Sequence, residues 1–202
     1  MSAREEVLGR VRRALRDVPA AEAPADVAVD RPEPRPTTPD DVELFAERVA
    51  DYKATVVRCT PEDLSTHLAA ALQGVPRLLV PADLPEELRQ ADAILDDDLT
   101  TAELDGVDGV LTTAALGIAE TGTIVLDHGP GQGRRAATLV PDLHVCVVRA
   151  DQVVADVTSA VARLDPARPL TWISGPSATS DIELDRVEGV HGPRTLVVLL
   201  VA

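Results

Sequence analysis

The chain has 202 residues, a formal net charge of −15 and a sequence pI near 4.5, and only 1% of its residues are aromatic. This length suits one domain of moderate size that can bury a core without disulfide bonds. The negative charge argues against nucleic acid or an anionic membrane surface as a partner. We therefore expect a single α/β domain with an aliphatic core built from Ala, Val and Leu.

Residues 1–17 are predicted to form an amphipathic helix, because Val7, Val11 and Leu15 recur every four residues with charges between them. The segment lacks the apolar centre of a signal peptide, and no apolar run is long enough to span a membrane. We therefore expect a cytoplasmic protein. The proline-rich residues 18–39 indicate an extended linker. The helix must then bury its apolar face on its own domain or on another subunit. Burial on another subunit would make the protein a homo-oligomer.

Residues 40–202 alternate short apolar runs with helical patterns. This alternation predicts a three-layer α/β/α sandwich around a mostly parallel sheet. The almost continuously apolar run 195–202 is typical of a central strand covered on both faces. Helices are expected from Asp40 or Asp41, from Pro61 and after an N-cap at Asp151, and strands are expected at 55–58, 77–80, 93–95, 107–111, 123–126, 143–148 and 171–173.

Metal and redox chemistry have little support in the sequence. Cys59 and Cys146 lie far apart in apolar runs, and each is expected to be buried and reduced. Without clustered Cys and His, we expect neither an iron-sulfur cluster nor a tetrahedral zinc in this chain. The acidic run 96–98 could bind a cation, but a solvated turn that caps a helix near Thr100 fits it better. His144 is expected to pack in or beside the core.

The stretch from Trp172 to Arg194 concentrates turn residues, hydroxyls, acids and arginines between two apolar runs. Its first turn, 174–176, precedes good N-cap residues, so a short helix with free N–H groups could favour an anion here. The second turn, 191–194, adds an imidazole and a guanidinium that binds carboxylate or phosphate. Alternatively, both turns only separate strands, with His191 and Arg194 tied to backbone carbonyls or to nearby acids.

A second candidate turn is Glu120-Thr121-Gly122-Thr123, between two expected strands. Glu120 could act as a general base or nucleophile, oriented by the neighbouring hydroxyls and with its pKa raised by burial. Alternatively, it bonds a backbone N–H or pairs with Arg134 or Arg135. The glycine-rich loop 129–133 before these arginines is either a weak phosphate-binding loop or a mobile lid.

Three motifs in order, IAETGTIVL, GRRAATLVPDLHVCVV and ISGPSATSDIELDRVEGVHGPRTLVVLL, make the chain similar to the LUD-domain family, known as lactate utilization protein C. The resemblance implies a NagB/RpiA/CoA-transferase-like fold, whose ligands lie at the carboxyl ends of strands. We therefore expect the Glu120 and Ser174 turns to meet at that edge. The residues expected to bind ligand are Thr121, Gly122, Thr123, Arg134, Arg135, Ser174, Gly175, Pro176, Ser177, Thr179, Asp181, Gly192 and Arg194, with Glu120 and His191 as catalytic candidates.

The resemblance further implies a part in bacterial oxidation of L-lactate to pyruvate, together with two other proteins that carry iron-sulfur clusters. Our first hypothesis is a non-redox component that binds a small carboxylate or phosphate or docks those partners. The second is a stand-alone enzyme of the CoA-transferase or sugar-phosphate isomerase type that uses Glu120. The third is a ligand-binding regulatory module.

Overall fold

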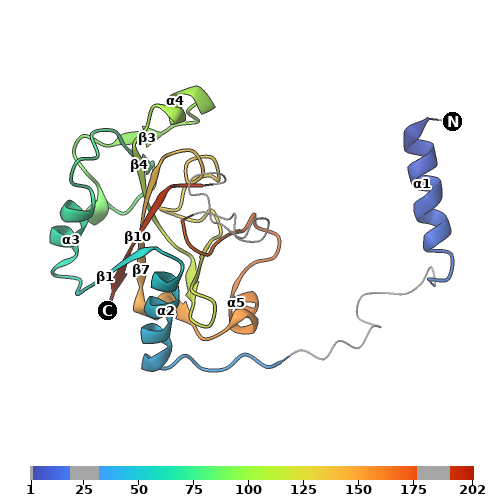
Figure 1. Cartoon of the computed structure of the whole chain (residues 1–202), viewed down its shortest axis with the longest axis horizontal. Helices are drawn as coiled ribbons and strands as arrows, with labels where there is room; N and C mark the ends of the chain where they lie inside the picture. Colours follow the sequence, from blue (N-terminus) through green and yellow to red (C-terminus); the bar gives the residue numbers. More distant parts are fainter. Residues whose placement is uncertain (1, 19–31, 177–191) are drawn as a thin grey trace. The chain divides into compact units, whose positions relative to one another are not determined.

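A computed structural model describes residues 2–18, 32–176 and 192–202 of the chain (Figure 1). The chain divides into two compact units, Met1–Pro32 and Glu33–Ala202. The first unit contains helix α1 (Ala3–Ala14), as the apolar spacing predicts. A capping box between Ser2 and Glu5 starts this helix. The apolar side chains of Val7 and Val11 are exposed.

The second unit is built on a sheet of six strands in the order β1-β10-β7-β4-β2-β3, in which every neighbouring pair is parallel. β10, β7 and β4 form its interior, which confirms the predicted central position of the last apolar run. The strands are β1 (Thr55–Cys59), β2 (Leu78–Pro81), β3 (Ile94–Asp96), β4 (Gly109–Thr113), β7 (Leu143–Arg149) and β10 (Thr195–Val201).

A second, four-stranded sheet has the order β8-β5-β6-β9, with β6 antiparallel to both β5 and β9. The sequence pattern does not predict this sheet, because strands of two to four residues do not reveal their partners. Its strands are β5 (Leu116–Ile118), β6 (Thr123–Leu126), β8 (Val153–Val154) and β9 (Thr171–Ile173).

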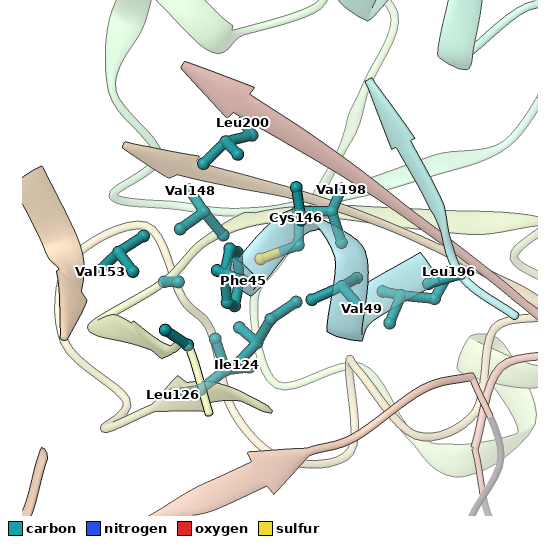
Figure 2. Close-up of a cluster of buried hydrophobic side chains, with 14 residues drawn as sticks. Phe45, Val49, Ile124, Leu126, Cys146, Val148, Val153, Leu196, Val198 and Leu200 are labelled. Atoms are coloured by element: carbon teal, nitrogen blue, oxygen red, sulfur yellow. The ribbon is translucent and has the colours of Figure 1, made fainter. Parts of the chain in front are cut away.

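Helices cover both faces of the parallel sheet, so the predicted α/β/α architecture is confirmed. Helix α3 (Leu64–Ala71) packs Leu68 against one face. On the other face, Phe45 of α2 (Pro39–Asp51) packs with Cys146 of β7 and Ile124 of the second sheet (Figure 2). Helix α5 (Val157–Arg163) lies on the outer side of that second sheet. The second sheet therefore lies between the parallel sheet and α5.

The helix starts show where local pattern and structure differ. Thr38, not Asp40 or Asp41, is the N-cap of α2. Helix α3 begins three residues after Pro61, because residues 61–63 form a turn. The predicted cap at Asp151 is also wrong. Asp151 lies in the short helix η3 (Ala150–Gln152).

Asp156 is the N-cap of α5 and accepts a hydrogen bond from the backbone N–H of Ser159. Val154, which the helical spacing Val154, Val157, Val161 assigns to the expected helix, therefore lies in strand β8. The predicted cap at Thr100 is confirmed, and it starts α4 (Thr101–Asp105). The remaining short helix is η2 (Glu86–Leu88). Among the described residues, no helix is long and apolar enough to cross a membrane.

Candidate functional site

The turns that carry Glu120 and Ser174 meet beside strands β6 and β9, which pair antiparallel with Ile124 opposite Ile173. Thr123 Oγ1 lies 2.8 Å from Ser174 Oγ and 2.7 Å from Thr121 Oγ1. This row of three hydroxyls joins the two turns. The predicted meeting of the turns is therefore confirmed. The three hydroxyls hydrogen bond to one another, which leaves fewer of their donors and acceptors for a ligand.

Glycine allows both turns to pack against the end of helix α2. Gly122 has a φ of 58°, and a Cβ atom there would lie 2.6 Å from the carbonyl carbon of Arg48. Gly175 has a φ of 86°, and a Cβ atom there would lie 2.8 Å from the carbonyl oxygen of Tyr52. Any larger residue would push the turn off the helix. These contacts position the row of hydroxyls.

A small cavity of about 70 Å³ lies on the Ser174 side of this junction. We call it the His144 cavity. Its walls include His144 and Leu196, which are the second residues of β7 and β10. The cavity therefore lies at the amino ends of these strands. The described residues that line it are Arg135, Thr138, His144, Trp172, Ile173, Ser174, Gly175, Pro176, Gly192, Pro193 and Leu196.

The turns do not meet at the carboxyl edge of the parallel sheet, where the sequence pattern places them. Both turns do follow the carboxyl ends of strands, because Glu120 lies just beyond β5 and Ser174 directly follows β9. Those strands, however, belong to the second sheet. That sheet brings their ends to the opposite edge of β7 and β10. A sequence pattern cannot show to which sheet a short strand belongs.

His144 is completely buried and begins a directed chain of polar contacts. Its Nε2 lies 2.8 Å from Thr112 Oγ1, and the Thr112 hydroxyl donates to Cys146 Sγ at 3.7 Å. The Cys146 thiol in turn donates to the carbonyl oxygen of Thr113 at 3.7 Å. Among the described residues, His144 Nδ1 has no hydrogen-bond partner.

Burial lowers the pKa of His144 to about 4, because the charged imidazolium loses its hydration, and the positive charge of Arg135 lowers it further. The ring is therefore neutral at pH 7. The predicted packing of His144 in the core is confirmed. Its place in a cavity wall is not predicted, and the only signal in the sequence is one imidazole within an apolar strand.

Arg134 and Arg135 are neighbours in the sequence with different surroundings. Arg134 binds the Asp96 carboxylate through Nε at 2.9 Å and through Nη2, and Nη2 also donates to the carbonyl oxygen of Leu99. This pairing holds the pKa of Arg134 above its ordinary value. It also shows that Asp96, whose side chain is 5% exposed, is not part of a solvated turn.

Arg135 is exposed and lines the His144 cavity. Its guanidinium makes no hydrogen bond or ion pair with the described residues. Of the two predicted ligand-binding arginines, Arg135 is therefore the one available to a ligand, while Arg134 is part of the framework.

Glu120 is exposed, contrary to the burial expected for it. Its backbone N–H donates to the carbonyl oxygen of Ala155 at 3.1 Å, which fixes the backbone of the turn. It lines a separate surface hollow with Arg48, Asp51, Tyr52 and Thr121, and it does not line the His144 cavity. The expected pairing with Arg134 is not found, because that arginine binds Asp96.

The second predicted turn is described only from Gly192 onward. Gly192 lines the His144 cavity. Arg194 instead forms an exposed ion pair with Asp142 at 3.4 Å. Of the remaining candidates, Ser177, Thr179, Asp181 and His191 lie outside the described residues.

The glycine-rich loop 129–133 is held in place by hydrogen bonds, which does not support a mobile lid. The backbone N–H of Asp127 donates to Gln132 Oε1 at 2.7 Å. The backbone N–H of Gly131 donates to Asp83 Oδ1 at 3.0 Å. Gln132 itself is buried. The loop therefore forms a fixed wall at the carboxyl end of β4.

The two cysteines are buried, as predicted, and lie on opposite faces of the parallel sheet. Cys59 belongs to the cluster under α3, whereas Cys146 belongs to the cluster under α2. Burial raises the pKa of Cys146 to about 12 and also raises that of Cys59. Two protonated thiols on opposite faces cannot ligate the same metal cluster.

Comparison with known proteins gives consistent results. The sequence pattern of the LUD domain matches residues 42–201. The chain is 47% identical over 190 residues to lactate utilization protein C of Deinococcus radiodurans, covering 87% of this chain and 90% of that protein. It is 34% identical over 100 residues to lactate utilization protein C of Bacillus subtilis, covering 46% of this chain and 41% of that protein.

A crystal structure of a DUF162 family protein from Deinococcus radiodurans has the same fold. It superposes with a TM-score of 0.70 at 40% identity, covering 83% of this chain and 100% of that one.

Proposed function

Because the chain belongs to the LUD domain family, we propose that it is a non-redox component of bacterial L-lactate utilisation. In this role it would act in the cytoplasm with iron-sulfur partner proteins and bind a small anionic ligand. The observation that carries the proposal is the 47% identity, over 90% of its length, to a protein named lactate utilization protein C.

The placement of the two cysteines supports the proposal that the iron-sulfur clusters are held by partner proteins and not by this chain. Clusters are held by several thiolates brought close together. Here Cys59 and Cys146 lie on opposite faces of one sheet and are held as thiols. The oxidation of lactate would then draw its iron-sulfur chemistry from other proteins.

The distribution of charge supports a small anion as the ligand. The chain carries a formal charge of −15, yet the His144 cavity is bordered by the guanidinium of Arg135 and by no described acid. A guanidinium without an acidic partner among the described residues attracts carboxylate or phosphate. The stand-alone enzyme built on Glu120 has less support, since Glu120 is exposed and outside this cavity.

Growth tests the proposal. A strain that lacks this chain should fail to grow on L-lactate as its carbon source and should grow normally on pyruvate. Reintroduced wild-type chain and a Glu120→Ala variant should both restore growth. Normal growth of the deletion strain on lactate would reject the proposal, and failure of Glu120→Ala alone would favour the enzyme built on that residue.

The iron-sulfur partners need a separate test. The chain, tagged at its chromosomal locus and purified at native expression, should retain proteins that contain iron and acid-labile sulfide in stoichiometric amounts. Loss of growth on lactate without such co-purification would keep the role in lactate utilisation and reject the proposed partners.

A further inference from the structure

The His144 cavity contains two polar groups that the described residues leave unsatisfied. One is Nδ1 of His144, which is buried and has no hydrogen-bond partner among the described residues. The other is the guanidinium of Arg135, a residue that lines the same cavity and whose positive charge acts on His144. Buried polar atoms are almost always hydrogen bonded in proteins, so an unpaired one needs an explanation. His128 shows the usual situation, with Nδ1 lying 2.8 Å from Gly133 O and Nε2 lying 3.4 Å from Thr171 Oγ1.

The proton of the neutral His144 ring is assigned to Nε2 from the polar chain behind it. The Thr112 hydroxyl donates its single hydrogen to Cys146 Sγ, and the Cys146 thiol donates to Thr113 O. Thr112 Oγ1 is then an acceptor for Nε2–H of His144. In this arrangement every donor of the chain is used. A neutral imidazole protonated at Nε2 has a lone pair at Nδ1, so the unsatisfied atom is an acceptor.

The size of the cavity limits what could supply the missing donor. A volume of about 70 Å³ holds a few water-sized groups. Pockets for drug-sized molecules and cofactors occupy at least about 300 Å³. A nucleotide or an acyl-CoA therefore does not fit, whereas a molecule of three carbons does. The ligand must also carry a negative group for Arg135 and a hydroxyl or amine for Nδ1.

We propose that the His144 cavity binds a small 2-hydroxy carboxylate, with its carboxylate at Arg135 and its hydroxyl donating a hydrogen bond to Nδ1 of His144. Only the choice of L-lactate as the probe rests on the proposed role in lactate utilisation. The 2-oxo acid of the same skeleton has an acceptor where the hydroxyl would be. The site should therefore distinguish the reduced acid from the oxidised one.

Three acids with the same carbon skeleton test the assignment on the unmodified full-length chain. L-lactate has a 2-hydroxyl, pyruvate a 2-oxo group and propanoate only hydrogens at this position. Titration calorimetry should show L-lactate binding about tenfold more tightly than propanoate, since one hydrogen bond to a buried acceptor is at stake. Pyruvate should bind no better than propanoate. Equal affinities for the three acids, or no binding of L-lactate, would overturn the proposal.

Two substitutions at His144 separate ligand binding from structure. His144→Asn keeps a polar atom near the position of Nδ1, and His144→Gln keeps one near the position of Nε2, where it can still reach Thr112. If Nδ1 binds the hydroxyl, His144→Asn should retain the preference for L-lactate over propanoate, and His144→Gln should lose it. The opposite pattern would show that His144 acts only through Thr112 and would reject the proposal.

Arg135→Gln tests the carboxylate contact without touching the core, because Arg135 is exposed. It should weaken binding of all three acids at least about tenfold, as expected for a charged hydrogen bond. Arg163→Gln is the matched control, because it removes the same charge from helix α5 outside the cavity. Equal effects of the two substitutions would show that only net charge matters and would overturn the contact.

The failures of the two proposals can be told apart. The protein could prefer L-lactate over pyruvate and propanoate and yet be dispensable for growth on lactate. That result would reject the proposed function and keep the proposed site. A protein that is required for that growth but does not bind L-lactate would keep the function and reject the site.

Discussion

The His144 cavity and the cleft at the carboxyl ends of β4 and β7 present arginines in opposite ways. The cleft is the larger hollow, about 590 Å³ against about 70 Å³, and Arg149, Arg163 and Arg168 line it. Arg168, however, pairs with Asp127 at 2.6 Å, and Arg149 pairs with Asp151 at 3.0 Å. In the His144 cavity, neither Arg135 nor His144 Nδ1 has such a partner among the described residues.

If the His144 cavity binds the ligand as proposed, pocket size is a poor guide to the site in this fold. The carboxyl ends of the strands form the usual crevice of open α/β sheets, and here they form the larger hollow. Most of the charge in that hollow is already neutralised by neighbouring acids. Arg163 in the cleft and Arg135 in the His144 cavity both lack a hydrogen bond or ion pair with the described residues, so what distinguishes the smaller cavity is the buried Nδ1 of His144 without a partner among those residues. Polar atoms without partners among the described residues therefore favour the His144 cavity as the ligand site, although the cleft has the larger volume.

The largest expected effect comes from disrupting the Glu120 turn, whose contact with α2 helps to position the row of hydroxyls. Gly122→Ala places a Cβ atom 2.6 Å from the backbone of α2 at a φ of 58°. Because helix backbone cannot move aside, we expect the free energy of unfolding to fall by about 3 to 5 kcal/mol. Gly74→Ala is the matched control, with a φ of 81° and open space around its Cβ.

Gly74→Ala should cost only about 1 to 2 kcal/mol, the conformational penalty for alanine at positive φ. Urea denaturation of both variants measures the difference. Equal losses would mean that the hairpin turn does not rest on α2, and the proposed support for the row of hydroxyls would be wrong.

The next effect is a pH dependence caused by buried His144. Its pKa is about 4 in the folded chain and about 6.5 when unfolded. The unfolded chain therefore binds the extra proton first, so stability present above pH 6.5 is lost as the pH falls toward 4. The total loss is about 3 kcal/mol.

Denaturation curves measured between pH 7 and pH 4 test this dependence. The His144→Asn variant should lose this part of the slope, whatever its stability at pH 7. An unchanged slope in the variant would show that His144 is hydrated in the folded protein, and the buried acceptor would no longer distinguish the cavity from the cleft.

Arg134→Gln and Arg135→Gln apply the same substitution to an arginine that pairs with Asp96 and to one without a partner among the described residues. Loss of Arg134 leaves the carboxylate of Asp96, which is 5% exposed, without its cation. We expect a loss of about 2 to 3 kcal/mol in the free energy of unfolding. Arg135→Gln should change stability by less than about 0.5 kcal/mol, as surface substitutions usually do. Similar losses for both variants would show that Arg135 also has a structural partner.

Much of the fold is predictable because its signals are local. The apolar run at 195–202 predicts β10, and Thr100 predicts the start of α4. The second sheet is not predictable, since its strands have two to four residues and two of its pairings, β5 with β8 and β6 with β9, join segments distant in the sequence. The misplaced cap at Asp151 has a similar cause. Val154 continues the helical spacing by coincidence but lies in a strand.

The site is predictable only in part, for a related reason. Gly and Ser residues at 122 and 174 mark the turns, and the turns do meet. The roles of Arg134 and Arg135 depend on Asp96, which lies in a strand 38 residues earlier. His144 presents the same difficulty. The sequence around a histidine in an apolar strand is the same whether or not its Nδ1 has a hydrogen-bond partner in the folded protein. Partners distant in the sequence decide which polar group is left for a ligand.

The smallest expected change in stability and binding concerns Arg194, which the sequence pattern also predicts to bind an anion. Its ion pair with Asp142 spans 3.4 Å, and the two side chains are 67% and 66% exposed. Such surface pairs contribute at most about 1 kcal/mol, and commonly much less. Arg194→Gln should therefore change stability by less than about 0.5 kcal/mol and leave L-lactate binding unchanged, in contrast to Arg135→Gln. If Arg194→Gln weakened binding as much as Arg135→Gln, the carboxylate would be attracted by the field of all nearby arginines, and the distinction between paired and unpaired cations would fail.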